Sequence, residues 1–332
     1  MAYSITLIPG DGIGPEVTAA AQEILDASGV DLEWQEASAG VSALEATGDP
    51  LPESTVEAVR AADATLKGPA TTPSGTGFRS VNVALRQKLT LYANFRPARS
   101  MPGIETRYDD VDLIVIRENT EGLYSGLEHT VVEGVVESLR IITAKASERI
   151  ARFAFQTAQR QDRKRVTCVH KANILKLSDG LFLDSCRKVA AEFPEIDFDD
   201  CIVDAAAMKL VSNPNQFDVL VMENLFGDIL SDLTSGLVGG LGVTPSANVG
   251  DGMAVFEAVH GSAPDIAGKG IANPTALILS AVLMLRYLGE KDAANRVEAA
   301  VRSVLAAGEA LTGDLGGQAT TKQFTQAVLS AM

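Results

Sequence analysis

A regular alternation of short apolar runs with helical patterns is the feature that most constrains how this chain folds. Apolar runs bounded by turn residues lie at residues 5–8, 113–116, 166–170 and 217–222. Segments with helical periodicity lie at residues 16–27, 145–160, 181–191 and 229–237. Because strands and helices that alternate along a chain pack against each other in layers, this pattern predicts an α/β fold.

Three further segments refine this prediction. Residues 130–143 are rich in Val, Ile and Glu with period-two stretches, which indicates an inserted antiparallel ribbon and a candidate dimer clasp. Residues 274–288 are rich in Ala, Leu and Ile and predict a buried helix, and residues 293–307 predict an amphipathic one. We find no internal repeat or flexible linker, so we expect the chain to pass back and forth between its domains.

The composition limits the function classes. A chain of 332 residues that is 46% hydrophobic can bury a large core, and two domains are expected. Lys and Arg total 28 against 43 Asp and Glu, a formal charge of -15, which repels nucleic acid and anionic membrane surfaces. We therefore expect a small-molecule substrate, no nucleic acid and no membrane. An anionic substrate would need a local cluster of arginines.

The cysteines and the N-terminus bear on the compartment. Cys168, Cys186 and Cys201 show neither C-x-x-C nor zinc-finger spacing, so we expect reduced core thiols. No apolar run approaches the roughly 18 residues of a membrane span, and the N-terminus has no signal or transit peptide. These features predict a cytoplasmic protein, although a mature mitochondrial chain without its presequence would look the same.

The glycine-rich segment at residues 9–16 follows a predicted strand. Its glycines are Gly10, Gly12 and Gly14, and Pro15 comes next, which does not match the G-x-G-x-x-G spacing of a dinucleotide cradle. We therefore predict a tight structural turn in preference to a phosphate site.

Asp228 and Asp232 are four residues apart on a predicted helix, which places both carboxylates on one face. Apolar neighbours such as Ile229 and Leu230 indicate burial, and buried paired carboxylates usually need a cation. Oxygen ligands without His or Cys suit Mg²⁺ or Mn²⁺. The alternative is a solvated helix face.

A set of arginines supplies the cluster that an anionic substrate would need. Ser80 is a candidate N-cap, and Asn82 and Arg86 lie one turn apart on the helix that it would begin. Arg96 and Arg117 follow downstream, and Arg117 comes directly after a strand, at the edge where α/β sites form. Guanidinium groups suit a substrate with several carboxylates, whereas a lone arginine is usually a surface ion pair.

Tyr124 and Lys171 are the candidate acid and base. Next to a divalent cation both would have a lowered pKa and could exchange protons near neutral pH, although an isolated Tyr or Lys is normally structural. His260 lies in a glycine-rich loop suited to a nucleotide.

Taken together, the chain resembles the isocitrate and isopropylmalate dehydrogenase family from about residue 5 to about residue 324. The resemblance is carried by residues 10–16, 67–73, 117–124, 170–173, 224–242, 257–264 and 314–317. The sequence departs from the family pattern at Ala205, Lys209 and the pair Met222 and Glu223.

The resemblance implies an α/β, isopropylmalate dehydrogenase-like two-domain fold, which is not a Rossmann fold, with a small inserted β clasp. Residues 1–92 and 239–332 would form a large domain on the cofactor side. Residues 93–238 would form a small domain, with a dimerisation clasp at about 125–145. It also implies a homodimer or higher homo-oligomer with shared active sites, to which the neighbouring subunit contributes Lys171, Asn173 and Asp204.

The activity implied is NAD-linked, divalent-metal-dependent oxidative decarboxylation of isocitrate to 2-oxoglutarate and CO₂, as in the tricarboxylic acid cycle. The resemblance assigns catalysis to Tyr124 and Lys171, and Mg²⁺ or Mn²⁺ to Asp204, Asp228 and Asp232. The implied substrate residues are Ser80, Asn82, Arg86, Arg96 and Arg117. The implied cofactor residues are Thr71, Asn173, His260, Gly261, Ser262, Ala263, Asp265, Ile266 and Asn273.

Two choices rest on particular side chains. Asp265 would accept hydrogen bonds from ribose hydroxyls and repel a 2′-phosphate, which favours NAD over NADP. Ser80 and Asn82 favour isocitrate, because an apolar substrate would leave them unpaired at a cost of roughly 1–3 kcal/mol each. The alternatives are a homoisocitrate, isopropylmalate or tartrate dehydrogenase and, more distantly, a non-catalytic regulatory subunit of a hetero-oligomeric isocitrate dehydrogenase.

Overall fold

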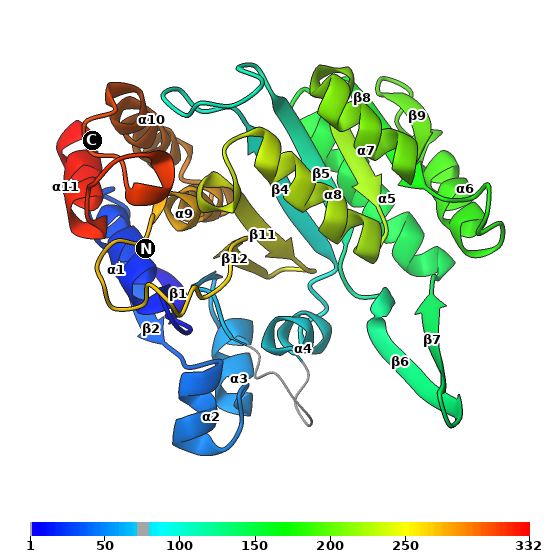
Figure 1. Ribbon diagram of the computed structural model, residues 1–332, viewed down its shortest axis with the longest axis horizontal. Helices are drawn as coiled ribbons and strands as arrows, with labels where there is room; N and C mark the ends of the chain where they lie inside the picture. The colour runs from blue at the N-terminus through cyan, green and yellow to red at the C-terminus, as the bar shows by residue number, and fades with distance from the viewer. Residues whose placement is uncertain (1, 72–79) are drawn as a thin grey trace. The chain divides into compact units, whose positions relative to one another are not determined.

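The computed structural model describes residues 2–71 and 80–332, and these form two compact units (Figure 1). The terminal unit contains both chain ends and comprises Met1–Leu89, Ser100–Asp109 and Val238–Met332. The central unit comprises Thr90–Arg99 and Asp110–Leu237. The sequence motif at 71–73 and the start of the segment at 78–86 fall partly outside the described residues.

The terminal unit is built on a sheet whose strands run in the order β2-β1-β3-β12-β11. β1 is parallel to β2 and β3, β3 is parallel to β12, and β11 is antiparallel to β12. The strands are β1 (Tyr3–Ile8), β2 (Leu32–Glu36), β3 (Ala64–Lys67), β11 (Pro245–Val249) and β12 (Ala254–Ala258). The parallel pairing of β3 with β12 places Lys67 opposite Glu257, at the ends of both strands.

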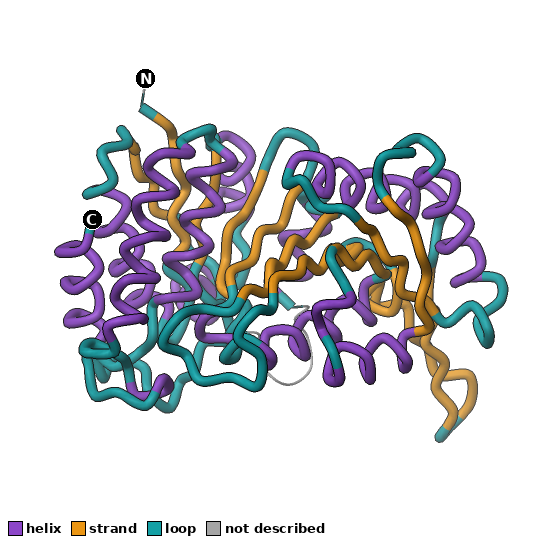
Figure 2. The backbone as a smooth tube through the Cα atoms, turned by 90° about the horizontal axis from the view of Figure 1, so that it is seen from above, coloured by secondary structure: helices purple, strands orange, loops and turns teal. Residues whose placement is uncertain are grey.

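Helices lie beside the strands of this unit (Figure 2). Among them, α9 (Thr275–Tyr287) packs directly on β3, β11 and β12. The predicted buried helix is confirmed, because most of its side chains are inaccessible to solvent. α10 (Lys291–Ala307) packs against α9 through one apolar face, as predicted. The unit also contains α1 (Gly14–Asp26), α2 (Val41–Thr47), α3 (Glu53–Ala61), α4 (Val81–Lys88), η2 (Leu241–Val243), η3 (Gly313–Leu315) and α11 (Thr321–Ala331).

The glycine-rich segment after β1 is a tight turn, as predicted. Gly10 and Gly12 have φ angles of 74° and 61°, which L side chains rarely adopt. A Cβ on Gly12 would lie 2.0 Å from the carbonyl oxygen of Ser262, and the next amide, that of Ile13, donates to the same oxygen at 2.9 Å. The turn is therefore packed tightly against the loop that contains Ser262.

The central unit has a second sheet segment with the order β4-β5-β10-β8-β9. β5, β10, β8 and β9 are parallel, and β4 is antiparallel to β5. The strands are β4 (Ala93–Arg99), β5 (Asp112–Glu118), β8 (Arg165–His170), β9 (Asp197–Ile202) and β10 (Val219–Met222). Because the carboxyl ends of parallel strands meet at one edge, the residues that follow them are brought together there.

Two pairs of helices flank these strands. α7 (Val203–Ser212) and α8 (Asn224–Leu237) pack on one face, and α5 (Ala144–Arg160) and α6 (Ser178–Ala190) on the other, as the green and yellow elements of Figure 1 show. A 3-10 turn, η1 (Pro214–Gln216), precedes β10. The alternation of strands and helices confirms the predicted α/β class.

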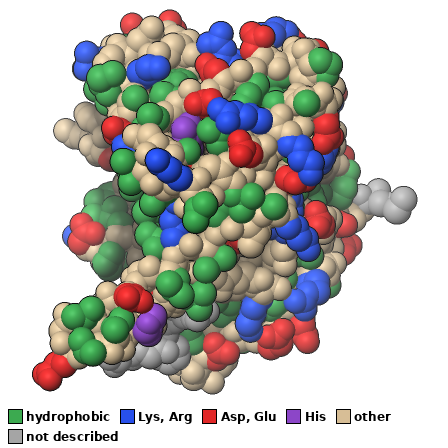
Figure 3. Space-filling view, turned by 90° about the vertical axis from the view of Figure 1, so that its right-hand side faces the viewer, with side chains coloured by type: hydrophobic (Ala, Val, Ile, Leu, Met, Phe, Trp, Pro, Cys, Tyr) green, Lys and Arg blue, Asp and Glu red, His purple; other side chains and the backbone are tan. Residues whose placement is uncertain are grey.

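The predicted inserted ribbon is confirmed as an antiparallel pair, β6 (Gly122–Val132) and β7 (Val135–Ile141). It begins earlier than residue 130, where the sequence pattern placed its start. Hydrophobic side chains gather on its surface in the space-filling view (Figure 3), and the exposed ones include Leu127, Val132, Val136 and Leu139.

The three cysteines are free and buried, as predicted. Within residues 2–71 and 80–332, no helix combines the length and the hydropathy that a membrane span requires.

Candidate active site

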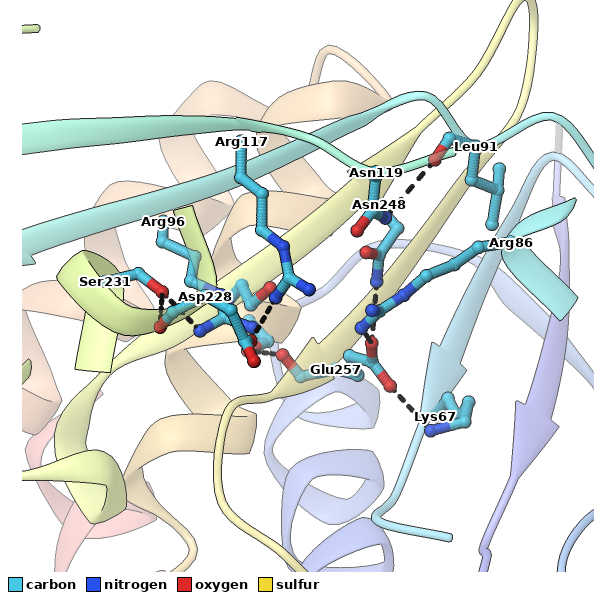
Figure 4. A network of polar contacts seen from close by, with 12 residues as sticks. Lys67, Arg86, Leu91, Arg96, Arg117, Asn119, Asp228, Ser231, Asn248 and Glu257 are labelled. Atoms are coloured by element: carbon cyan, nitrogen blue, oxygen red, sulfur yellow. Dashed lines mark hydrogen bonds and ion pairs between the residues drawn. The ribbon is translucent and has the colours of Figure 1, made fainter. Parts of the chain in front are cut away.

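Asp228 lies in the second turn of the helix α8, and residues from two strands, β5 and β6, hold its carboxylate (Figure 4). Arg117, at the carboxyl end of β5, donates to one oxygen of its carboxylate, and the Tyr124 hydroxyl on β6 donates to the other. The Arg117 guanidinium also donates to Asn224 Oδ1 from Nε at 2.9 Å and from a terminal nitrogen at 2.7 Å. Arg117 is therefore fixed by the start of the helix that carries Asp228.

Arg96 on β4 holds the next turn of the same helix. It donates to Ser231 Oγ at 2.6 Å and forms an ion pair with Asp232 at 3.0 Å. The Arg96 side chain is 7% exposed, whereas the Asp232 side chain is 54% exposed, so one carboxylate oxygen faces solvent. The central unit thus brings together five predicted site residues: Arg96, Arg117, Tyr124, Asp228 and Asp232.

The charges in this cluster shift the pKa values of its members. Partial burial acts to raise the pKa of Asp228, but the charge of Arg117 and the hydrogen bond from Tyr124 outweigh it and lower the pKa below its ordinary value. Burial, followed by the hydrogen bond to Asp228, raises the pKa of Tyr124. The sequence predicted a lowered pKa for Tyr124 next to a divalent cation. The protein surroundings alone raise this pKa.

The predicted burial of the aspartate pair is only partly right. Ile229 is 56% exposed, and the side chains of Asp228 and Asp232 are 37% and 54% exposed. Both carboxylates also have arginine partners already. Their chemistry nevertheless fits a hard divalent ion, since two oxygen donors lie one turn apart and Asp232 keeps an accessible oxygen. In the described part of the chain, no three Asp, Glu, His or Cys side chains form a metal-binding group.

Lys171 and Asp204 form a separate pair, because they follow the neighbouring strands β8 and β9. The lysine Nζ donates to Asp204 Oδ1 at 2.5 Å. This hydrogen bond lowers the pKa of Asp204. Asn173 lies two residues further on and is exposed. Within one chain, Asp204 therefore does not join Asp228 and Asp232 in a metal-binding group.

A buried charge cluster in the terminal unit surrounds Glu257 (Figure 4). Its carboxylate accepts from Lys67 at 2.6 Å, from Arg86 at 2.8 Å and from Asn248 at 2.7 Å. Burial acts to raise the pKa of Glu257, but the charges of Lys67 and Arg86 outweigh it and hold the pKa well below its usual range. The sequence motifs contained Lys67 and Glu257, yet our reading of the residues gave neither a role. Lys67, at the end of a buried strand, was the feature of the sequence that could have predicted this cluster.

The helix α4 presents the other predicted substrate residues. Ser80 occupies the N-cap position, as predicted, and its side chain makes no capping hydrogen bond. Asn82 and Arg86 lie one turn apart, as expected. Among the described residues, the buried atoms Asn82 Oδ1 and Arg86 Nε have no hydrogen-bond partner. Buried polar atoms of this kind are suited to a polar ligand.

The predicted cofactor residues of the terminal unit lie in the loop after β12 and beside it. Thr71 Oγ1 and Ser262 Oγ are 2.6 Å apart, and Ala263 adopts a positive φ of 38°. His260 Nε2 is buried without a partner in the described chain, and burial lowers the pKa of its imidazole. This neutral, unsatisfied ring fits a nucleotide that offers hydrogen bonds.

The remaining members of this set differ in exposure. A side chain at Gly261 would meet open space, Asp265 is exposed and Ile266 is half-buried. Asn273 is built into the fold, since it donates to Asp314 Oδ2 at 2.9 Å and accepts from the Thr275 amide at 3.0 Å at the start of α9.

The fold and these clusters define an α/β protein with arginine-rich, carboxylate-bearing sites. The chain belongs to the isocitrate/isopropylmalate dehydrogenase family, whose model matches residues 4–328. This confirms the resemblance inferred from the sequence motifs.

Individual relatives agree with this membership. The chain is 55% identical over 324 residues to isocitrate dehydrogenase [NAD] catalytic subunit 5, mitochondrial, of Arabidopsis thaliana, covering 97% of this chain and 87% of the relative. It is 55% identical over 305 residues to a chloroplastic 3-isopropylmalate dehydrogenase of Solanum tuberosum, covering 92% and 85%. The crystal structure of isocitrate dehydrogenase from Methylococcus capsulatus matches with a TM-score of 0.96 and 54% identity, covering 99% of each chain, which confirms the predicted fold.

The predicted cytoplasmic location was wrong. The Arabidopsis relative, and relatives from Drosophila melanogaster and Homo sapiens at 52% identity, are mitochondrial by name. The prediction rested on the absence of a leader, and a mature organellar chain lacks one as well.

Proposed function

We propose that this chain catalyses NAD-linked oxidative decarboxylation of isocitrate to 2-oxoglutarate and CO₂ and requires a divalent metal. The observation that carries the proposal is the pairing of Arg96 and Arg117 with Asp232 and Asp228 on one helix. Guanidinium groups and metal-binding carboxylates side by side suit a substrate that is both a polycarboxylate and a chelating 2-hydroxy acid. Relatives named as NAD isocitrate dehydrogenase subunits support the choice.

The carboxylates of Asp228 and Asp232 would hold Mg²⁺ or Mn²⁺, together with Asp204 of the partner subunit. When bound, the ion supplies Lewis-acid chemistry that stabilises negative charge on oxygen. Arg117 and Arg96 hold both helix carboxylates in place, and their positive charges would attract the substrate carboxylates. Arg86 would bind a further carboxylate, with Glu257 fixing its orientation.

Lys171 and Tyr124 would carry the proton transfers. Lys171, in its neutral amine form, would accept the proton of the substrate hydroxyl, and its Nζ lies at hydrogen-bond distance from Asp204. Tyr124 returns a proton to C3 after CO₂ has left. Its hydroxyl carries the proton that it donates to Asp228, and this proton makes Tyr124 the candidate acid.

Substrate and cofactor choice would depend on the terminal unit. Ser80 and Asn82 would donate hydrogen bonds, from the hydroxyl and from the amide nitrogen, to the carboxylate that distinguishes isocitrate. NAD would bind along the loop after β12, with Asp265 accepting from ribose hydroxyls. The proposed cofactor set is Thr71, His260, Gly261, Ser262, Ala263, Asp265, Ile266 and Asn273, with Asn173 from a neighbour.

A homodimer or higher homo-oligomer with shared active sites would complete the enzyme. Large apolar side chains support this proposal, because Leu177 is 90%, Ile174 68% and Met208 61% exposed on the central unit. Exposed apolar side chains that lie together are typical of protein–protein contacts. The ribbon of β6 and β7 would act as a clasp between subunits.

A second candidate is oxidation of 3-isopropylmalate, which the similarity to the potato relative favours. The polar side chains on α4 oppose it, since an isopropyl group would leave Asn82 and Ser80 unsatisfied.

The test is a kinetic comparison of the purified chain with isocitrate, homoisocitrate, 3-isopropylmalate and tartrate. Each is assayed with NAD or NADP and with Mn²⁺ or EDTA. We expect the highest kcat/KM for isocitrate with NAD and Mn²⁺. A higher value for another acid would refute the proposed substrate, and no turnover at all would favour a regulatory subunit.

A further inference from the structure

Arg140, on β7, lies between two buried carboxylates of the central unit. Its guanidinium pairs with Asp179 in the first turn of α6 and forms an ion pair with Glu223 at 3.3 Å, without hydrogen-bond alignment. The side chains of Asp179 and Glu223 are 1% and 3% exposed, and that of Arg140 is 14% exposed. One arginine is therefore the shared ion-pair partner of two buried acids, and a buried acid without a cation is costly.

The first acid fixes the backbone of Lys171. Asp179 Oδ2 accepts a hydrogen bond from the Lys171 amide at 2.5 Å, while Oδ1 faces Arg140. Ser178 Oγ, beside Asp179, also accepts from Arg140 at 3.3 Å. The position from which the lysine side chain leaves the strand end is thus set by the Asp179–Arg140 pair.

The second acid begins the helix α8. Glu223 Oε2 accepts from the Leu225 amide at 3.2 Å and Oε1 from the Phe226 amide at 3.0 Å, which is the pattern of an N-cap. The Phe226 ring centroid lies 5.2 Å from the Arg140 guanidinium carbon.

We propose that Arg140 is a positioning residue, which ties the Lys171 backbone and the start of α8 to the ribbon. The inference rests on the proposed function, in which Lys171 accepts a proton and α8 carries the metal-binding carboxylates. Because that function assigns Lys171 to the site of a neighbouring subunit, Arg140 would set the geometry of two sites. A planar guanidinium can face both acids at once, whereas the single ammonium of a lysine cannot hold both equally well.

The test compares Arg140→Met with Arg140→Lys and with a control, Arg152→Met. Arg152 pairs with Glu192 at 2.5 and 2.7 Å, but both side chains are largely exposed on the surface. Amide hydrogen exchange is followed over residues 171–176 and 224–228, with β10 as the internal reference. Steady-state kinetics give kcat and KM for the same proteins.

For Arg140→Met we expect amide exchange in both segments to rise by about tenfold or more, with β10 unchanged. We expect kcat to fall at least about tenfold while KM for isocitrate and NAD changes less than about twofold, and Arg140→Lys to recover part of the loss. Arg152→Met should match the unmodified chain. Unchanged exchange in both segments, or a kcat loss no greater than in the control, would overturn the proposal.

A second variant covers the case of misfolding, and the exchange measurement separates this proposal from the proposed function. If Arg140→Met does not fold, Glu223→Gln replaces it, because the amide removes the ion pair and keeps an acceptor for the α8 cap. Unchanged exchange at residues 224–228 in that variant would then overturn the proposal. A wild-type chain that does not turn over isocitrate would contradict the proposed function alone, since the exchange comparison needs no substrate.

Discussion

Lys67 and Glu257 lie opposite each other at the ends of two parallel strands and form a buried ion pair of 2.6 Å. Arg86 reaches the same carboxylate from α4, so two cations share one glutamate. Removing it would leave both cations buried without an anion, which is more costly than losing a surface pair.

Glu257→Gln therefore tests this cluster through pH. The folded-state pKa lies well below the unfolded value of about 4.3, so the contribution of Glu257 to stability is fully present above that value and is lost as the pH falls through the folded pKa. We expect Glu257→Gln to destabilise by roughly 3 kcal/mol at pH 7, and by less as the pH falls below about 4. Urea unfolding at pH 7 and again at a pH below about 4 measures how the difference in the free energy of unfolding between the variant and the unmodified chain changes.

The matched control is Glu53→Gln, since Glu53 pairs with Lys88 at 2.8 Å with both side chains exposed. A change of at most about 1 kcal/mol is expected there. Equal destabilisation by the two variants at pH 7 would contradict the account of the cluster.

Tyr124→Phe tests the proposed acid. The ring, whose centroid lies 5.0 Å from the Arg117 guanidinium carbon, would remain, and only the hydroxyl that donates to Asp228 is lost. We expect kcat with isocitrate to fall by about a hundredfold or more with little change in KM. Tyr287→Phe on α9 is the control. A kcat within twofold of wild type, roughly 0.4 kcal/mol in the barrier, would exclude Tyr124 as the acid.

Asp265→Lys combined with Ile266→Tyr tests cofactor choice. Both residues lie outside the core, so the fold should tolerate the change. A cation in place of the carboxylate should attract a 2′-phosphate and remove the acceptor for ribose hydroxyls. We expect the ratio of kcat/KM for NAD to that for NADP to fall by about tenfold or more. An unchanged ratio would refute the role given to Asp265.

Asp232→Asn tests the metal site, with Asp251→Asn as an exposed control. Titration with Mn²⁺, monitored by electron paramagnetic resonance, measures the affinity of each variant for Mn²⁺ without any need for turnover. Loss of one carboxylate ligand should weaken binding by at least about tenfold, because a neutral amide replaces an anionic oxygen. Equal Mn²⁺ affinity in the two variants would argue against Asp232 as a ligand.

The sequence predicted the elements with strong periodicity and missed those whose residues are polar. The strand β9 contains Asp197, Asp199 and Asp200, which disfavour a strand, and it forms only because it pairs with β8 at the sheet edge. The start of α8 was placed at Ile229, because the cap at Glu223 has no Ser, Thr, Asp or Asn to signal it.

The candidate site was predicted as residue types and not as contacts. Strand ends and motifs pointed to Arg117, Asp228 and Lys171. The partners that orient them, such as Asn224 for Arg117 and Asp179 for Lys171, were missed. Asn224 is 107 residues from Arg117 in sequence, whereas Asp179 is only eight residues from Lys171 and meets its amide because α6 begins beside the end of β8. The predicted burial of α8 was also inaccurate. An apolar side chain such as Ile229 predicts a core position from the sequence alone, but Ile229 is exposed in the structure.

The most direct test of the proposed function is a product balance for the purified chain with isocitrate labelled in the carboxylate on C3, in the presence of NAD and Mn²⁺. The proposed reaction predicts one NADH, one labelled CO₂ and one 2-oxoglutarate for each isocitrate consumed, and no product when EDTA replaces Mn²⁺. NADH without labelled CO₂, turnover in EDTA, or faster NADH formation from 3-isopropylmalate would contradict it.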